Sequence, residues 1–362
     1  MIQDKVLIFN YYEPDINKGG PIGFISHNFI DKPRDKFVLL SDLNSYIKNK
    51  YLRGIRILSS KFYCISKEQA FLSTINHIRQ LFYIHNCSNY KYIYFHDCLS
   101  LYALKDMLNP RQVVILQSHS PQLPSWELKE QKHNQKSIDF FEKAEKFSFE
   151  KADIIVFPNE RSADLYQDLI HKPEKLKYIL SGAKAYSSLR LYPLDQSKIN
   201  LLYIGRREAT KGFDLLIDTF FKIRKEREDL RLLLLGNGAD LTTDDKSIID
   251  LGFTTTPNNW YNSVDYVINA NRISYFDLSV IEALSTGVPM ILSASNGHNY
   301  YKNKSEDIIC YDSNNNFGLF DVLKSSSLTK KETRSISNIN LYQHELSDIE
   351  YIKRFNLFVD GL

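Results

Sequence analysis

The sequence predicts an α/β protein with two domains, each built on a parallel sheet. Short apolar runs alternate with longer segments of helical periodicity along most of the chain, and this alternation favours βα units. The chain has 362 residues, more than one ordinary hydrophobic core usually holds. Between Gly182 and Ser197 the alternation pauses, and small residues with a proline show no clear period. We therefore predict that this segment links the two domains.

Each predicted domain contains several short buried strands. Those of the first half are residues 5–10, 36–40, 54–58, 91–96, 112–117, 153–158 and 175–180. Those of the second half are residues 199–205, 230–236, 248–253, 265–270 and 289–294. Helical spacing of apolar residues is clearest at 67–86, 134–152, 213–226 and 346–359. Ligands of such sheets bind beyond the carboxyl ends of the strands, so the loops after the strands are the places to look for a site.

The composition limits the compartment and the class of partner. A net charge of +3 is too small to predict nucleic acid as a partner. The four cysteines form no C-x-x-C pair, so we expect neither a zinc site nor a disulfide framework, and we predict a reducing, cytoplasmic compartment. The N-terminus carries acids before any long apolar run, unlike a signal peptide, and no apolar stretch approaches the ~20 residues that span a bilayer. These features predict a soluble protein.

The clearest local signal for a ligand is the segment from Leu201 to Phe220, LLYIGRREATKGFDLLIDTF. A buried strand is followed by a short loop that contains Arg206 and Lys211, and Gly212 leads into a helix. Two cations beside the positive end of a helix suit an anion. The loop lacks the G-x-x-x-x-G-K-[ST] pattern of a nucleoside triphosphatase. From the chemistry alone, solvated loop charges remain an equal alternative.

The order of several motifs resembles a GT-B glycosyltransferase of the large retaining group called family 4. The motifs are the loop with Gly19 and Gly20, YFHD at 94–97, VVILQSHSP at 113–121, IGRREATKG at 204–212, LLLLGNG at 232–238 and FDLSVIEALSTGVPMI at 276–291. The resemblance implies two Rossmann-like domains with parallel sheets that face each other across a cleft. It implies an acceptor-side domain at 1–185, a nucleotide-sugar donor domain at 186–345 and a C-terminal helix at 346–362 that crosses back to the first domain.

In the donor domain the resemblance assigns roles to an acid and to a helix start. Glu282 matches the second glutamate of the family's E-x7-E motif, which accepts hydrogen bonds from the ribose hydroxyls, and a carboxylate has two oxygens for such a diol. The bland alternative is a surface helix acid, although neighbours such as Ile281 and Leu284 read as buried. The helix start Asp277-Leu278-Ser279 would offer backbone N–H groups to the diphosphate.

The cations of the loop complete the predicted donor site. By the same resemblance, Arg206 and Lys211 would clamp the diphosphate as charge builds on it in the transition state.

Two departures from the family pattern stand in the same segment. Ser274 takes the place of the first glutamate, which in relatives reaches the donor sugar, and Asp277 takes the place of the usual glycine. A serine is shorter and uncharged, so sugar recognition must differ if Ser274 lines the cleft. Asp277 either replaces the lost sugar contact or caps the helix from Leu278, a common use of aspartate. We expect the cap.

In the N-terminal domain, His119 follows the strand VVILQS and matches the family histidine beside the reacting sugar carbon. His96 and Asp97 end the preceding strand and are candidates for the same cleft. Gly19 and Gly20 match the loop that approaches the donor phosphate, where a Cβ would obstruct. For both histidines, ordinary hydrogen bonding in a loop is the alternative.

A basic segment at 48–67 concerns partners. It contains six lysines and arginines with aromatic residues among them and no acid, a composition that suits an anionic membrane surface or a lipid-linked acceptor. A solvated loop beside a core strand explains the same residues equally well. We keep peripheral contact with the membrane as a hypothesis.

The resemblance implies a retaining transferase that moves a hexosyl or related sugar from a nucleotide diphosphate sugar to a hydroxyl of a glycan, lipid-linked or protein acceptor. The nucleotide sugar is a co-substrate and no cofactor is expected. No Asp-x-Asp motif stands near a strand end, so we expect no metal. The setting implied is the cytoplasmic assembly of a surface polysaccharide, glycolipid or glycoprotein. Alternatives are a catalytically inactive GT-B-like subunit of an active transferase and a sugar-nucleotide epimerase, which share the architecture.

Overall fold

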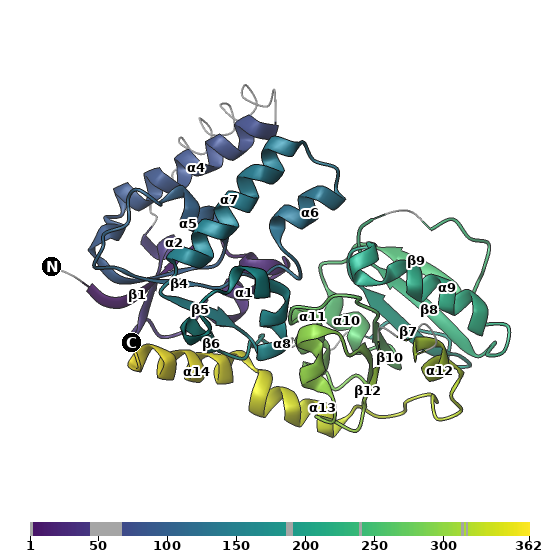
Figure 1. Cartoon of the computed structure of the whole chain (residues 1–362). Coiled ribbons are helices and arrows are strands. Elements are labelled where there is room, and N and C mark those ends of the chain that lie inside the picture. Colours follow the sequence, from purple (N-terminus) through teal and green to yellow (C-terminus); the bar gives the residue numbers. More distant parts are fainter. Residues whose placement is uncertain (1–2, 44–66, 186–190, 239–240, 313–314, 316–317) are drawn as a thin grey trace, which may run out of the picture. The chain divides into compact units, whose positions relative to one another are not determined.

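The computed structural model describes residues 3–43, 67–185, 191–238, 241–312, 315 and 318–362 (Figure 1). The strand predicted at 54–58 and the basic segment 48–67, apart from the backbone of Lys67, lie outside the described residues. The chain forms two compact units. The first unit comprises Met1–Phe157, Leu165–Ile179 and Ile352–Leu362, and the second comprises Pro158–Asp164 and Leu180–Tyr351.

A parallel sheet of six strands forms the centre of the first unit, in the order β2-β1-β3-β4-β5-β6. Its strands are β1 Gln3–Phe9, β2 Phe37–Leu39, β3 Tyr90–Phe95, β4 Val113–Leu116, β5 Ile154–Phe157 and β6 Leu176–Tyr178. Each lies within a segment predicted to be a strand, apart from shifts of one or two residues at the ends. Together with the second sheet described below, they confirm the predicted α/β class.

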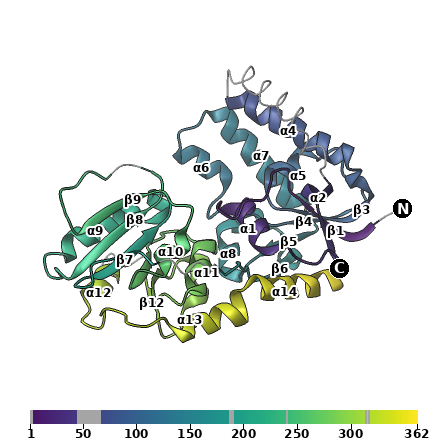
Figure 2. The ribbon, with the colours of Figure 1, turned by 180° about the vertical axis from the view of Figure 1, so that it is seen from behind.

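Helices cover both faces of this first sheet, and the alternation of side chains along the strands decides what each helix meets. Phe9 packs against Phe82 of helix α4 (Lys67–Ile84). On the opposite face, the ring of Tyr94 stacks on Phe355 of helix α14 (Asp348–Asp360), and Phe355 also packs on Phe29. Helix α5 (Cys98–Ala103) contacts both α4 and α7 (Gln135–Lys151). Both views show α14 running along the first unit (Figures 1 and 2).

The second unit repeats the plan with the strand order β12-β11-β10-β7-β8-β9, all parallel. Its strands are β7 Ile199–Ile204, β8 Leu230–Leu235, β9 Ile248–Gly252, β10 Tyr266–Asn269, β11 Met290–Ser293 and β12 Ile308–Tyr311. The sequence analysis missed β12, whose residues Ile308–Tyr311 follow a polar stretch and show no alternating pattern. The strand order reverses between β7 and β10, and open α/β sheets bind their ligands at such a switch point.

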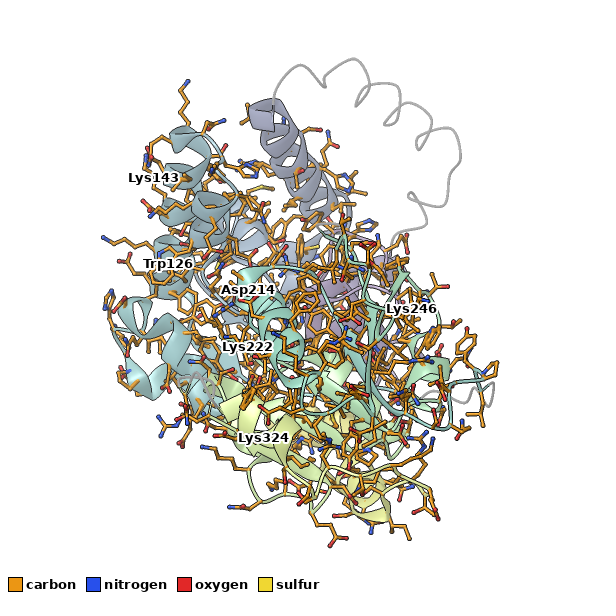
Figure 3. All side chains as sticks on the ribbon, turned by 90° about the vertical axis from the view of Figure 1, so that its right-hand side faces the viewer. Trp126, Lys143, Asp214, Lys222, Lys246 and Lys324 are labelled. Carbon is orange, nitrogen blue, oxygen red and sulfur yellow. The ribbon has the colours of Figure 1, made fainter. Side chains whose placement is uncertain are left out.

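Helix α9 (Phe213–Ile223) follows β7 and is strongly amphipathic. Leu216, Phe220 and Ile223 are buried in the core of the second unit. Asp214 and Lys222 lie on its outer surface (Figure 3). Helix α12 (Gly318–Lys324) packs against α9.

The remaining elements are short. The other helices are α1 Gly20–Asn28, α2 Leu40–Leu43, α6 Pro124–Glu130, α8 Glu160–Ala163, α10 Pro257–Tyr261, α11 Leu278–Ser285 and α13 Ile336–Leu341. Turns of 3₁₀ helix lie at Cys87–Asn89, Asp164–Leu169, Pro173–Lys175, Ala209–Lys211 and Asn296–Tyr301, and a π turn lies at Tyr342–Leu346. Within the described part of the chain, no helix is long and apolar enough to cross a membrane.

Candidate functional site

Two loops leave the sheet of the second unit at its switch point and touch each other. Residues 205–212 follow β7, and residues 270–277 follow β10. Gly212 has a φ of +64°, and a Cβ at this position would lie 1.9 Å from the carbonyl oxygen of Ala270. Arg272 N also donates to Thr210 O at 3.0 Å. Only glycine fits at position 212, so the sequence fixes Lys211 beside the loop that precedes α11.

Lys211 forms an ion pair with Asp277 across these loops. Lys211 Nζ lies 2.7 Å from Asp277 Oδ2, and both side chains are about five-sixths buried, with 16% and 15% of their surface exposed. Asn271 Nδ2 donates to the same oxygen at 2.8 Å. Burial alone would raise the pKa of Asp277, but Lys211, His298 and the hydrogen bonds outweigh burial and hold that pKa well below its ordinary value.

This pairing corrects our expectation for Asp277. Helix α11 begins at Leu278 and Asp277 occupies the N-cap position, but its side chain accepts no hydrogen bond from the helix. The carboxylate turns instead to Lys211 and Asn271, because a buried ammonium attracts it more strongly than neutral N–H groups. The backbone N–H of Asp277 is also taken, since it donates to His298 Nε2 at 3.2 Å. Of the three predicted donors of this helix start, Leu278 and Ser279 remain.

His298 is a member of this cluster that the sequence analysis missed. It follows β11, the neighbour of β10, and its side chain is fully buried. Burial lowers the pKa of His298 to about 4, with Lys211 acting in the same direction and Asp277 opposing it. At neutral pH the ring is therefore uncharged, as an acceptor for the Asp277 N–H must be. The sequence offered one signal for His298: it follows a predicted strand, and ligands of parallel sheets bind beyond the carboxyl ends of the strands.

Ser274 is enclosed by the loops after β10 and β11. Its side chain is fully buried, and its Oγ lies 2.6 Å from Ser295 Oγ. Gly297 N donates to Ser274 O at 3.1 Å, and a Cβ on Gly297 would lie 1.6 Å from Tyr275 O. The loops after β10 and β11 are thus closely joined, and the idea that Ser274 lines the site is wrong.

Glu282 is buried on α11, with 8% of its surface exposed. The surface-acid alternative is therefore wrong, and Ile281, Ala283 and Leu284 are fully buried as predicted. Whether Glu282 accepts hydrogen bonds from a ribose stays a prediction.

The two arginines after β7 have different surroundings. Arg206 is half-exposed and pairs with Glu208 at 3.2 Å, which fits the alternative of a solvated loop charge. The side chain of Arg207 is only 3% exposed and pairs with Asp250 in β9, with Nη1 2.6 Å from Oδ2. Arg207 therefore joins the loop after β7 to β9, whereas Lys211 is the predicted cation that lies at the start of α11.

In the first unit the structure brings the two predicted histidines together. His96 Nδ1 lies 2.9 Å from His119 Nε2, and both rings pack against Phe24 of α1. Burial lowers the pKa of His119 to about 3. Burial also holds the pKa of His96 well below its ordinary value, with His119 adding to the effect. Both rings are uncharged at neutral pH.

Three other predicted residues of this unit have structural roles at the starts of α5 and α1. Asp97 caps α5, because Oδ1 accepts from Ser100 N at 2.6 Å and Oδ2 from Ser100 Oγ at 2.8 Å. The structure therefore gives Asp97 a capping role. Gly19 caps α1 and Gly20 has a φ of +61°, so the backbone explains the glycine at position 20.

The comparisons with known proteins agree with this fold. Residues 198–321 match the family model described as "Glycosyl transferases group 1". None of the curated proteins compared with this sequence matches it.

Three solved structures are similar to this chain. For each, the first coverage value is the share of this chain that is aligned, and the second is the share of the other chain. HepE (Alr3699) of Anabaena in complex with UDP has 13% identity, covers 99% and 100%, and has a TM-score of 0.65. Sucrose-phosphate synthase (tll1590) from Thermosynechococcus elongatus has 17% identity, covers 81% and 79%, and has a TM-score of 0.62. The lipopolysaccharide outer core galactosyltransferase WaaB in its apo form has 14% identity, covers 99% and 99%, and has a TM-score of 0.57.

The match to HepE extends over nearly the whole length of both chains and confirms the predicted GT-B type of fold. Lys211, Asp277 and Glu282 all lie inside the segment that the family model matches. The chain therefore carries a glycosyltransferase group 1 domain at residues 198–321.

Proposed function

We propose that this protein is a retaining glycosyltransferase that moves a sugar from a nucleotide diphosphate sugar to a hydroxyl acceptor. The observation that carries the proposal is the position of Lys211. Its ammonium lies at the start of α11 and at the switch point between β7 and β10, within the glycosyltransferase group 1 domain. A cation beside a helix N-terminus is suited to stabilising a leaving diphosphate.

A uridine nucleotide is the first donor to test. HepE has been solved in complex with UDP-glucose, and the pneumococcal O-GlcNAc transferase GtfA in complex with UDP and GlcNAc. These complexes support a UDP-sugar as the donor for a chain of the same fold, and they leave the sugar and the acceptor to experiment.

The proposed roles follow the chemistry of each group. Lys211, with Arg206 at the loop surface and the N–H groups of Leu278 and Ser279, stabilises the leaving diphosphate. Glu282 accepts hydrogen bonds from the ribose. In the domain proposed at 1–185, His119 contacts the donor sugar and His96 holds its ring, while the domain proposed at 186–345 holds the nucleotide. Gly19 and Gly20 are proposed to let the backbone approach the phosphate.

The proposed reaction needs no metal, and the donor phosphate oxygen helps to deprotonate the acceptor on the same face of the sugar. Chelation with EDTA should leave the rate unchanged. The proposed setting is the cytoplasmic side of a membrane, where the segment 48–67 contacts anionic lipid and a lipid-linked or glycan acceptor is extended.

A second candidate is a non-catalytic subunit that binds a glycan or protein partner of an active transferase. Two observations favour it: Ser274 is buried, and the charge of Lys211 is already neutralised by Asp277. Incubation with a panel of nucleotide sugars separates the candidates. Slow release of free sugar and nucleoside diphosphate indicates a transferase, a new sugar isomer indicates an epimerase, and binding without turnover indicates the subunit.

A further inference from the structure

An acid lies inside the site proposed to hold an anion. Asp277 Oδ2 is 2.7 Å from Lys211 Nζ. A phosphate oxygen bonded to that ammonium would lie ~3 Å from Nζ. It follows that any such oxygen is at most ~6 Å from Asp277 Oδ2, whichever direction it approaches from. Repulsion between the carboxylate and a bound diphosphate is therefore unavoidable if the diphosphate uses Lys211.

The neighbouring groups do not cancel this repulsion. The positive charge of Lys211 is balanced by Asp277 itself, and Arg206 is balanced by Glu208. His298 is buried beside Asp277 and uncharged at neutral pH. Asp277 stays ionised, because its pKa lies well below its ordinary value. The protein thus maintains a full negative charge next to the cation that the ligand needs.

The two forms of the nucleotide differ in the charge that meets Asp277. In the donor, both phosphates are esterified and the diphosphate carries two charges. Transfer breaks the bond between the sugar carbon and the phosphate oxygen, and the electron pair stays on that oxygen. The acceptor oxygen bonds to the sugar carbon, and its proton passes by way of the departing phosphate oxygen to solvent. The terminal phosphate of the product then carries a further charge near neutral pH, since its second pKa is about 6.

We propose that Asp277 is a specificity-determining residue that disfavours the free nucleoside diphosphate relative to the nucleotide sugar. The inference rests on the proposed function and concerns the same site. A carboxylate within reach of the terminal phosphate weakens product binding more than donor binding, because only the product carries the additional charge. Two unit charges ~5 Å apart near a protein surface interact strongly enough to change an equilibrium constant by about tenfold or more. The residue therefore limits product inhibition and speeds product release.

The test compares the affinities of UDP and UDP-glucose by titration calorimetry for the wild type and for Asp277→Asn. Asparagine keeps the shape and the hydrogen bond to Lys211 while removing the charge. We expect Asp277→Asn to bind UDP about tenfold more tightly, and UDP-glucose with a clearly smaller gain. The difference between the gains in affinity for UDP and for UDP-glucose should become smaller in high salt, where charges are screened. Equal gains for both ligands, or no gain, would overturn the inference.

Two controls keep the result specific. Asp229→Asn removes an acid that is paired with Arg227. Asp229 directly precedes β8, at the amino end of the strands, whereas the proposed site lies at their carboxyl end. This variant should leave the ratio of the UDP and UDP-glucose affinities unchanged. Asp277→Gly is a second variant if the asparagine protein does not fold, with the same expected direction. Inorganic pyrophosphate serves as a probe that needs no base, and it should also bind Asp277→Asn more tightly than the wild type.

Lys211→Met separates failure of the inference from failure of the proposed function. If Lys211→Met binds UDP and pyrophosphate as well as the wild type does, the diphosphate does not use Lys211, and both the proposed site and the inference fall. If Lys211→Met weakens binding but Asp277→Asn leaves the ratio unchanged, only the inference falls.

Discussion

Ser274 Oγ lies 2.6 Å from Ser295 Oγ, and neither side chain is open to solvent. This contact joins the loop after β10 to the loop after β11 and explains why position 274 is small and uncharged. The side chain of Ser274 therefore contributes to packing within the second unit. The backbone route taken by residues 274–277 is fixed by Ser295, Gly297 and His298.

Ser274→Glu should destabilise the protein rather than restore a sugar contact. The new carboxylate would be buried without a cation, which costs about 3–5 kcal/mol. Ser274→Ala should cost only about 1 kcal/mol, the usual worth of one hydrogen bond. Urea unfolding gives both values. Ser279→Glu, in the first turn of α11, is the control and should keep its stability, because acids are favoured at helix N-termini. A Ser274→Glu protein as stable as the wild type would show that this packing is not as described.

Lys211→Met should lower kcat by about 10²–10³-fold, as expected for loss of a group that stabilises developing charge. Arg206→Ala should have a smaller effect, because Arg206 is half-exposed and paired with Glu208. The methionine variant also leaves Asp277 without its ammonium, so part of the loss could arise from instability. The double variant Lys211→Met/Asp277→Asn removes both charges and controls for this. Near-normal turnover in the double variant would exclude a catalytic role for Lys211.

Glu282→Gln should weaken the binding of both UDP and UDP-glucose, since a neutral amide is a poorer acceptor for ribose hydroxyls. 2′-Deoxy-UDP should then lose less affinity than UDP on the same substitution. Calorimetry measures both ligands. Unchanged affinity for UDP would remove Glu282 from the nucleotide site and leave it a buried structural acid.

Stability should fall as the pH is lowered from about 6.5 to 4, in part through His298. Burial lowers the pKa of His298 to about 4 in the folded state, against about 6.5 when unfolded. The unfolded chain therefore binds more protons across this window, so stability is full above 6.5 and declines by up to about 3 kcal/mol toward pH 4. His298→Gln keeps an acceptor for Asp277 N–H and removes the titration. His119 contributes in the same direction, so the slope should become shallower in His298→Gln without vanishing. Equal slopes for the two proteins would contradict the assignment.

The basic segment 48–67 should bind vesicles only when they contain anionic lipid, and the binding should weaken with salt. Replacing Lys48, Lys50 and Arg53 by glutamine should reduce it. Sedimentation with neutral vesicles is the control. Equal partitioning of the wild type and the triple variant would contradict the hypothesis that this segment contacts a membrane.

The strands and long helices were predictable because their signal is local. Runs such as residues 230–235 and the apolar spacing of α9 need no knowledge of the partner. The site was less predictable because its contacts join distant segments. Asp277 looked like a helix cap from its neighbours, yet its partner Lys211 lies 66 residues away. Ser274 was predicted to line the site from its place in the motif, but its hydroxyl contacts Ser295, 21 residues further along the chain. His298 belongs to no motif that the sequence analysis used.

The most direct test of the central claim is time-resolved NMR of the sugar first released from the donor that the nucleotide-sugar panel identifies, for the wild type and Lys211→Met. A retaining transferase predicts that the first anomer has the configuration of the donor. The rate should fall by about 10²-fold or more in Lys211→Met. Release of the opposite anomer would contradict retention. If no donor is turned over, either by untreated protein or by protein treated with EDTA, the claim that the protein is an enzyme would be contradicted.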